Sequence, residues 1–136
     1  MPVIYYDSRT GNVQRFIDKV KTETGWEFHK IQENQPAYER GHLITFTTRF
    51  GEIPESTKQF LTESASLIDT VSSSGNRNWG RNFGVAADQI SSQLRIPLLL
   101  KFELSGTAED VNQFIKRIKE NNYGNKRHRE ELDSTQ

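Results

Sequence analysis

Short apolar runs with high β propensity alternate along this chain with segments whose apolar residues recur at the helical period. In the first such segment Val13, Phe16, Ile17 and Val20 fall at positions i, i+3, i+4 and i+7, which form one face of an amphipathic helix. Extended along the chain, this pattern predicts the order β-α-β-β-α-β-α-β-α. Strands that alternate with helices in this way form a parallel sheet covered by helices on both faces, with right-handed crossovers. We therefore expect a doubly wound α/β domain.

The pattern also gives the bounds of each element. Strands are expected at residues 2–6, 26–31, 42–48, 67–72 and 97–104. Helices are expected from Val13 to a stop at Gly25, from Pro54 onward, from Phe83 to Leu94, and from a Thr107/Asp110 capping box through Ile118. The connection 32–41 is polar and contains Pro36, so we expect a loop there in place of a crossover helix.

Length and composition limit the classes of function. The 136 residues suit one domain, which we place at residues 1–124, followed by a charged tail, 125–136, that is predicted to be disordered. The chain has no cysteine, so redox chemistry would require a bound cofactor. Its 18 basic and 18 acidic side chains argue against a nucleic-acid partner. No apolar run is long enough to cross a membrane and no signal peptide is visible, so a cytoplasmic location is expected.

The loop after the first strand has the composition of a phosphate-binding loop. Ser8 and Thr10 supply hydroxyl groups, Gly11 permits close approach of the backbone, and Asn12 adds an amide just where a helix is expected to begin. The amino-terminal end of a helix favours anions. The alternative interpretation is an ordinary strand-to-helix turn with a Ser or Thr cap. The loop matches neither the Walker motif nor the dinucleotide-binding motif.

Three segments resemble those of known flavoproteins. The string from Ser8 to Val13 is similar to the FMN-phosphate loop of flavodoxins, Thr/Ser-x-Thr-Gly-Asn-Thr, with Val13 in place of the last Thr. More specifically, Gly75-Asn76-Arg77-Asn78-Trp79-Gly80 and the segment 102–107 resemble the ribonucleotide reductase stimulatory flavoproteins, the NrdI family. The resemblance covers residues 3–118. It implies a flavodoxin-like, five-stranded parallel sheet of order 2-1-3-4-5 and an FMN cofactor.

The resemblance also implies which residues bind FMN. The expected set is Ser8, Arg9, Thr10, Gly11, Asn12, Val13, Thr47, Thr48, Arg49, Phe50, Gly51, Ser73, Ser74, Gly75, Asn76, Asn78, Trp79 and Gly80. No catalytic side chain and no metal site are expected, since His29, His42 and His128 lack the spacing of metal ligands.

Several of these residues have specific expected roles. Trp79 is expected to stack on the isoalloxazine ring, or else to pin its own loop. Asn76 and Asn78 are expected at the pyrimidine edge of the ring. Gly51 permits a peptide to flip beside the flavin N5, although the loop 47–54 lacks the glycine run of some family members. Phe50 is either a second ring wall or a core residue.

The implied function is that of a redox accessory protein, not a free-standing enzyme. In this family the reduced flavin converts O₂ to a superoxide- or peroxide-level oxidant, which serves to assemble the dimanganese-tyrosyl radical cofactor in the class Ib ribonucleotide reductase small subunit. An unidentified reductant would supply electrons to the flavin. Arg77 and Arg81 either face such a partner, steer a small anion such as superoxide, or are exposed solubilising residues. The alternatives are a general electron-transfer flavodoxin, which is usually strongly acidic, and a regulatory domain without flavin.

Overall fold

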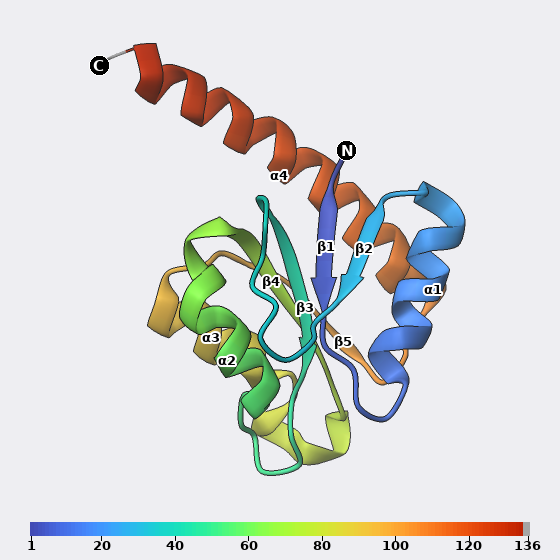
Figure 1. The fold of residues 1–136 in the computed structure, drawn as a ribbon. Coiled ribbons are helices and arrows are strands. Elements are labelled where there is room, and N and C mark those ends of the chain that lie inside the picture. Colours follow the sequence, from blue (N-terminus) through green and yellow to red (C-terminus); the bar gives the residue numbers. More distant parts are fainter. Residues whose placement is uncertain (135–136) are drawn as a thin grey trace.

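The computed structural model describes the backbone of residues 1–134 and the side chains of this range other than those of residues 79, 81, 82 and 122–134. Its centre is a sheet of five parallel strands in the order β2-β1-β3-β4-β5. The strands are β1 (Val3–Tyr6), β2 (Glu27–Lys30), β3 (Gly41–Phe46), β4 (Ile68–Gly75) and β5 (Leu98–Glu103). Both the doubly wound architecture and the strand order are confirmed. The loops that follow β1, β3 and β4 gather at the lower edge of the sheet in Figure 1.

In the described residues, three α-helices and two short 3₁₀-helices lie between the strands, and a fourth α-helix follows β5. The α-helices are α1 (Asn12–Thr24), α2 (Glu55–Ser64), α3 (Val85–Leu94) and α4 (Ala108–Ser134), and the 3₁₀-helices are η1 (Ala65–Leu67) and η2 (Arg77–Asn82). Gly25 ends α1 in a left-handed conformation, with a φ of 65°. None of the described helices has the length and hydropathy needed to cross a membrane.

The beginning of α4 agrees with the capping box seen in the sequence. The Thr107 amide donates to Asp110 Oδ2 over 2.8 Å, and the Asp110 amide donates to Thr107 Oγ1 over 3.1 Å. The helical backbone then continues to Ser134, past the boundary at residue 124 that we predict from composition. That boundary, and the disorder predicted for residues 125–136, stay predictions because no side chain in this segment is described.

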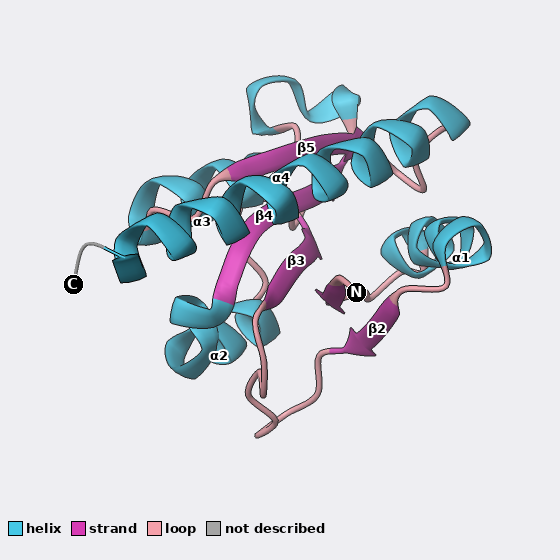
Figure 2. Ribbon diagram, turned by 90° about the horizontal axis from the view of Figure 1, so that it is seen from above, coloured by secondary structure: helices cyan, strands magenta, loops and turns pink. Residues whose placement is uncertain are grey.

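A separate apolar core fills each face of the sheet, and Figure 2 shows the helices on its two sides. On the face covered by α1 and α4, Phe16 stacks on Phe102 with 4.0 Å between ring centroids and meets Phe114 edge-on at 5.5 Å. On the other face α2 and α3 pack over a core that includes Tyr5 and Leu43. Because both faces are covered, the central strands can be apolar on both sides.

A loop replaces the crossover helix between β2 and β3, as predicted, and specific hydrogen bonds hold it. The Tyr5 hydroxyl donates to the Glu39 carbonyl over 2.8 Å, and the Ala37 amide donates to Ser64 Oγ over 2.8 Å. Tyr38 donates through its hydroxyl to the Glu27 carboxylate and also contacts His29 Nε2. The loop is therefore attached both to the edge strand β2 and to α2.

The main difference from the predicted elements lies in β4, which continues to Gly75 and does not end at Ser72. The three residues Ser73, Ser74 and Gly75 pair with β5, and Ser73 and Ser74 also pair with β3. Polar residues in a strand resemble a loop in sequence, but pairing on both sides satisfies the backbone here. The strand β3 is shorter than predicted and ends at Phe46 instead of residue 48.

The stacked phenylalanines lead to a prediction about stability. Phe16 has no exposed surface, so Phe16→Ala should lower the free energy of unfolding by about 3–5 kcal/mol. Phe50 is 80% exposed, and the matched control Phe50→Ala should change it by less than about 0.5 kcal/mol. Urea unfolding followed by circular dichroism measures both values. Equal effects would contradict the packing described here.

The Tyr38 contact leads to a prediction about proton binding. Its hydrogen bond to Glu27 is the main reason why the pKa of Glu27 is lowered and that of Tyr38 is raised. A lowered carboxyl pKa gives stability that is present above the ordinary value and is lost as the pH falls through the folded value. Tyr38→Phe should therefore raise the pKa of Glu27 toward normal, as measured by carboxyl-carbon NMR, with Glu27→Gln assigning the resonance. An unchanged pKa would mean that the contact is absent in solution.

Candidate functional site

A cleft of about 400 Å³ opens where the loops after β1, β3 and β4 meet. This volume is within the range of small-molecule sites, about 300–1,000 Å³. It lies at the carboxyl ends of the strands and next to the change in strand order between β1 and β3, where open α/β sheets bind ligands. The residues that line it are Ser8, Arg9, Thr10, Asn12, Val13, Phe46, Thr47, Thr48, Arg49, Ser74, Gly75, Asn76 and Leu104.

The loop 8–11 turns sharply into α1 and leaves backbone donors at the cleft. Gly11 precedes the helix with a φ of 94°, a left-handed conformation that favours glycine. The Gln14 amide donates to Ser8 Oγ over 3.2 Å. Among the described residues, the amides of Asn12 and Val13 and the Thr10 hydroxyl have no protein hydrogen bond. These unused groups at a helix amino terminus suit an anion such as a phosphate.

The charge of the cleft also favours an anion. Arg9 and Arg49 line it, and none of the described residues that line it is a carboxylate. The Arg9 guanidinium lies over the Phe46 ring, 5.6 Å from its centroid, which holds the positive charge at the cleft wall. The positive end of the α1 dipole adds to the charge of these two arginines.

The Asn12 side chain, which lines the cleft, also makes hydrogen bonds within the protein. Its Oδ1 accepts hydrogen bonds from the Arg15 guanidinium and, over 3.1 Å, from Ser105 Oγ. Arg15 Nε in turn donates to Ser105 Oγ over 2.8 Å. Asn12 therefore connects the beginning of α1 to Ser105, in the loop after β5.

The segment after β3 forms a closed turn beside the cleft. The Thr48 amide donates to the Glu52 carbonyl over 3.0 Å, and the Gly51 amide donates to the Thr48 carbonyl over 2.9 Å. Gly51 has a φ of 75°, and its carbonyl accepts from Gln89 Nε2 over 3.0 Å. Phe50, at the tip of this turn, is exposed, so the interpretation as a core residue is wrong.

Only part of the predicted set after β4 faces the cleft. Ser74, Gly75 and Asn76 line it, whereas Ser73 is fully buried. Ser73 Oγ donates to the Gly84 carbonyl over 2.7 Å and accepts from the Ala87 amide over 3.2 Å, so it ties β4 to the beginning of α3. A Cβ placed on Gly75 would lie only 2.5 Å from the Gly84 nitrogen, so this glycine is needed for packing.

The remaining predicted residues lie around the cleft without lining it. They are Gly11, Phe50, Gly51, Asn78 and Gly80. The backbone amide of Asn78 donates to Asn76 Oδ1 over 2.9 Å, and this hydrogen bond caps η2. The Trp79 and Arg81 side chains lie outside the described residues, so their roles stay predictions. The Arg77 guanidinium lies 4.6 Å from the Phe83 ring centroid, and its amide donates to Glu103 over 3.0 Å.

Three contributors to this region escaped the sequence analysis. Phe46 and Leu104 line the cleft, and each lies at or just beyond the end of its strand. The third is Asp7, a buried carboxylate directly before the loop 8–11. An aspartate after a strand resembles an ordinary turn residue. Its burial depends on α2, which is distant in sequence, so no local pattern could identify it.

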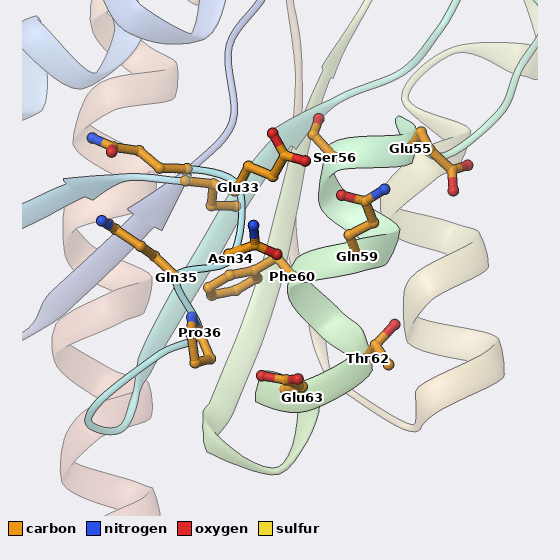
Figure 3. A pocket seen from close by; sticks show the side chains of 12 residues that line it. Glu33, Asn34, Gln35, Pro36, Glu55, Ser56, Gln59, Phe60, Thr62 and Glu63 are labelled. Carbon is orange, nitrogen blue, oxygen red and sulfur yellow. The ribbon is translucent and has the colours of Figure 1, made fainter.

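A second and larger hollow, of about 540 Å³, lies between α2 and the segment 31–36 (Figure 3). Glu33, Glu55 and Glu63 line it, and their negative charges would repel a phosphate. Within the described part of the chain, no group of three or more His, Asp or Glu side chains could hold a metal ion. Charge therefore favours the smaller cleft as the ligand site.

Comparison with known proteins agrees with this geometry. A family model described as NrdI flavodoxin-like matches residues 4–116. The Protein NrdI of Bacillus licheniformis is 47% identical over 115 residues, which cover 85% of this chain and 86% of that protein. The SPbeta prophage-derived protein NrdI of Bacillus subtilis is 41% identical over 113 residues, 83% of this chain and 88% of the relative.

Solved structures with similar folds are flavodoxins. A short-chain flavodoxin associated with a non-canonical PDU bacterial microcompartment has a TM-score of 0.62 and 17% identity, covering 85% of this chain and 92% of its own. The flavodoxin of Streptococcus pneumonia TIGR4 has a TM-score of 0.63 and 19% identity, covering 90% and 98%. At these identities the likeness shows the fold alone.

Two neighbouring serines in β4, Ser72 and Ser73, test whether the hydrogen bonds between β4 and α3 stabilise the protein. Ser72 and Ser73 are both fully buried, but Ser72 Oγ has no hydrogen-bond partner among the described residues. Ser73→Ala should lower the free energy of unfolding by about 0.5–1.5 kcal/mol, because it removes two hydrogen bonds, while the Ala87 amide keeps its 3.2 Å bond to the Gly84 carbonyl. Ser72→Ala should leave it unchanged or raise it. Chemical denaturation measures both, and a larger loss for Ser72→Ala would refute the assignment.

Proposed function

The chain belongs to the NrdI flavodoxin-like family, and from this we propose that it is an FMN-binding redox protein that activates the class Ib ribonucleotide reductase small subunit. The family and the fold imply a flavin cofactor and a role associated with ribonucleotide reductase. We propose FMN as the flavin, a dimanganese small subunit as the partner and the cytoplasm as the location.

The observation that carries the FMN proposal is the pairing of unused donors with positive charge at one end of the cleft. The amides of Asn12 and Val13 and the Thr10 hydroxyl have no partner in the described structure. Arg9 and Arg49 add positive charge, and no lining carboxylate opposes it. A terminal phosphate ester suits these donors, and this distinguishes FMN from a flavin without phosphate.

The rest of the cleft suits a flat, partly apolar ring. Phe46 and Leu104 supply apolar surface, while Thr47, Thr48 and Asn76 supply polar groups near the strand ends. Thr48 is held in the closed turn, which fixes one wall before a ligand arrives. In our proposal Trp79 covers a ring face and excludes water, and Gly51 gives the neighbouring peptide its freedom to turn.

The cofactor would supply the redox chemistry: in our proposal, electrons from an unidentified reductant would pass through FMN held in the cleft to O₂, giving a superoxide- or peroxide-level product for assembly of the dimanganese-tyrosyl radical site. The protein holds the phosphate, orients the ring and presents the cleft to its partner. No side chain acts as an acid, base or nucleophile in this proposal. Phe50 projects beside the cleft and is available to such a partner.

A general electron-transfer flavodoxin is the competing function. Such carriers use strong negative charge to dock several acceptors. This chain has 18 basic and 18 acidic side chains, so its formal net charge is zero. That balance favours a dedicated partner over general electrostatic docking.

We expect the purified protein to bind FMN, to bleach on anaerobic dithionite titration and to reoxidise rapidly in air. Added to a manganese-loaded class Ib small subunit with O₂, the reduced protein should generate the tyrosyl radical, detected by electron paramagnetic resonance. Failure to bind FMN would reject the flavoprotein proposal. Flavin binding without activation, together with electron transfer to unrelated acceptors, would favour the general carrier.

Two threonine variants test whether FMN binds in the cleft. Thr10→Val should weaken FMN binding about tenfold to a hundredfold, because a hydrogen bond to a charged phosphate contributes about 1.5–3 kcal/mol. Thr22→Val alters an exposed α1 residue whose hydroxyl donates to the Asp18 carbonyl, and it should leave the affinity unchanged. Quenching of flavin fluorescence measures both dissociation constants. Equal affinities would place the phosphate elsewhere.

A further inference from the structure

A buried carboxylate lies directly before the loop that lines the cleft. Asp7 follows β1, and only 7% of its surface is exposed. Its Oδ2 accepts hydrogen bonds from Ser56 Oγ over 2.5 Å and from Thr57 Oγ1 over 2.7 Å. Both donors are in the first turn of α2, and Ser56 is visible there in Figure 3. Asp7 therefore connects the end of β1 to a helix that is about 50 residues away in sequence.

The contact continues into the middle of the sheet. Thr57 Oγ1 is 2.7 Å from Thr45 Oγ1, and because Thr57 donates to Asp7, Thr45 is the donor in this second bond. The Asp7 amide donates to the Ile44 carbonyl over 2.9 Å. Asp7 is thus held by β3 through its backbone and by α2 through its side chain. Buried polar groups with complete hydrogen bonding fix one local arrangement.

We propose that Asp7 is a positioning residue for the phosphate end of the cleft: its contact with α2 holds the loop 8–11 where the amides at the start of α1 converge on a phosphate. The inference rests on the proposed binding of FMN. Asp7 does not line the cleft itself, so it acts through the loop that it precedes.

The loop needs such an anchor because its own hydrogen bonds are few. Gly11 begins α1 without a side-chain cap and in a left-handed conformation. In the described residues, Ser8 Oγ accepts from the Gln14 amide and the Gly11 carbonyl accepts from the Arg15 amide over 2.9 Å. Asn12, the first residue of α1, bonds Arg15 and Ser105, so all of these contacts lie on the helix side. On the strand side, the Asp7 contacts hold the point where the chain leaves β1 and enters the loop 8–11.

The opposite wall of the cleft does not depend on Asp7. The Thr47 amide donates to the Ser74 carbonyl over 2.9 Å, and Thr48 and Glu52 close their own turn. Gln89 adds a bond from α3 to Gly51. Loss of the Asp7 contact should therefore disturb the phosphate end selectively and leave the ring wall in place.

The negative charge of Asp7 does not oppose this role. Its carboxylate faces two hydroxyl donors and the positive end of the α2 dipole, all of which compensate a negative charge. What the loop requires is the pair of accepted hydrogen bonds. An asparagine has an oxygen that can accept the same two bonds, and an alanine does not.

The test compares FMN with riboflavin, which has the same ring but no phosphate. Asp7→Ala should weaken FMN binding at least tenfold and change riboflavin binding by less than about threefold, while Asp7→Asn should retain FMN affinity within about threefold. Ser56→Ala, at an exposed position, should weaken FMN binding in the same direction by a smaller factor. Asp18→Ala, on the exposed face of α1, is the matched control and should change neither affinity.

Each outcome decides the question. Equal losses for FMN and riboflavin in Asp7→Ala would overturn the proposal, because a general structural role weakens both. Unchanged FMN binding in Asp7→Ala and Ser56→Ala would also overturn it. If Asp7→Ala does not fold, Ser56→Ala provides the test. A larger loss of affinity for FMN than for riboflavin in this variant supports the proposal, and equal losses overturn it. Absence of FMN binding by the wild-type protein would instead reject the proposed function, and thermal unfolding of the apoproteins separates stability from positioning.

Discussion

The pairing of β1 with β2 on one side and β3 on the other determines where this molecule can bind a ligand. After β2 the chain crosses back over β1, so the connections on the two sides of β1 lead in opposite directions. The loops after β1 and β3 therefore separate and leave room at the carboxyl edge. The loop 8–11, the turn 48–52 and the end of β4 surround that space. The site depends on strand order before it depends on any individual side chain.

Charge then selects among the spaces that the fold provides. The larger hollow beside α2 carries three glutamates, whereas the cleft carries two arginines and unpaired amides. A phosphate-bearing ligand would be repelled by the first and attracted by the second. The zero formal charge of the chain does not reveal this contrast, because the arginines line the cleft while the glutamates line the hollow beside α2. The local distribution of charge, and not the net charge, indicates which kind of ligand can bind.

The sequence was sufficient wherever a feature depends on neighbouring residues. The periodicity of Val13, Phe16 and Ile17, the stop at Gly25 and the Thr107/Asp110 cap all follow from local rules, and the structure contains each of them. Strand order came from the resemblance, because periodicity does not specify which strands pair. Local patterns placed Ser73 in a loop, since a serine in a polar run resembles a loop residue, whereas it belongs to β4. They also gave no sign of Asp7, whose partners Ser56 and Thr57 are brought to it only by the fold.

The short edge strand β2 has a consequence for how copies of this protein behave when they are crowded together. Its four residues pair with β1 on one side only, so the other side presents open backbone groups. Exposed edges of this kind recruit strands from other molecules and begin aggregation. Here the edge is brief and carries Glu27 and Lys30, and the loop held by Tyr38 attaches beside it. The missing crossover helix thus leaves an edge whose length and charge resist intermolecular sheet growth.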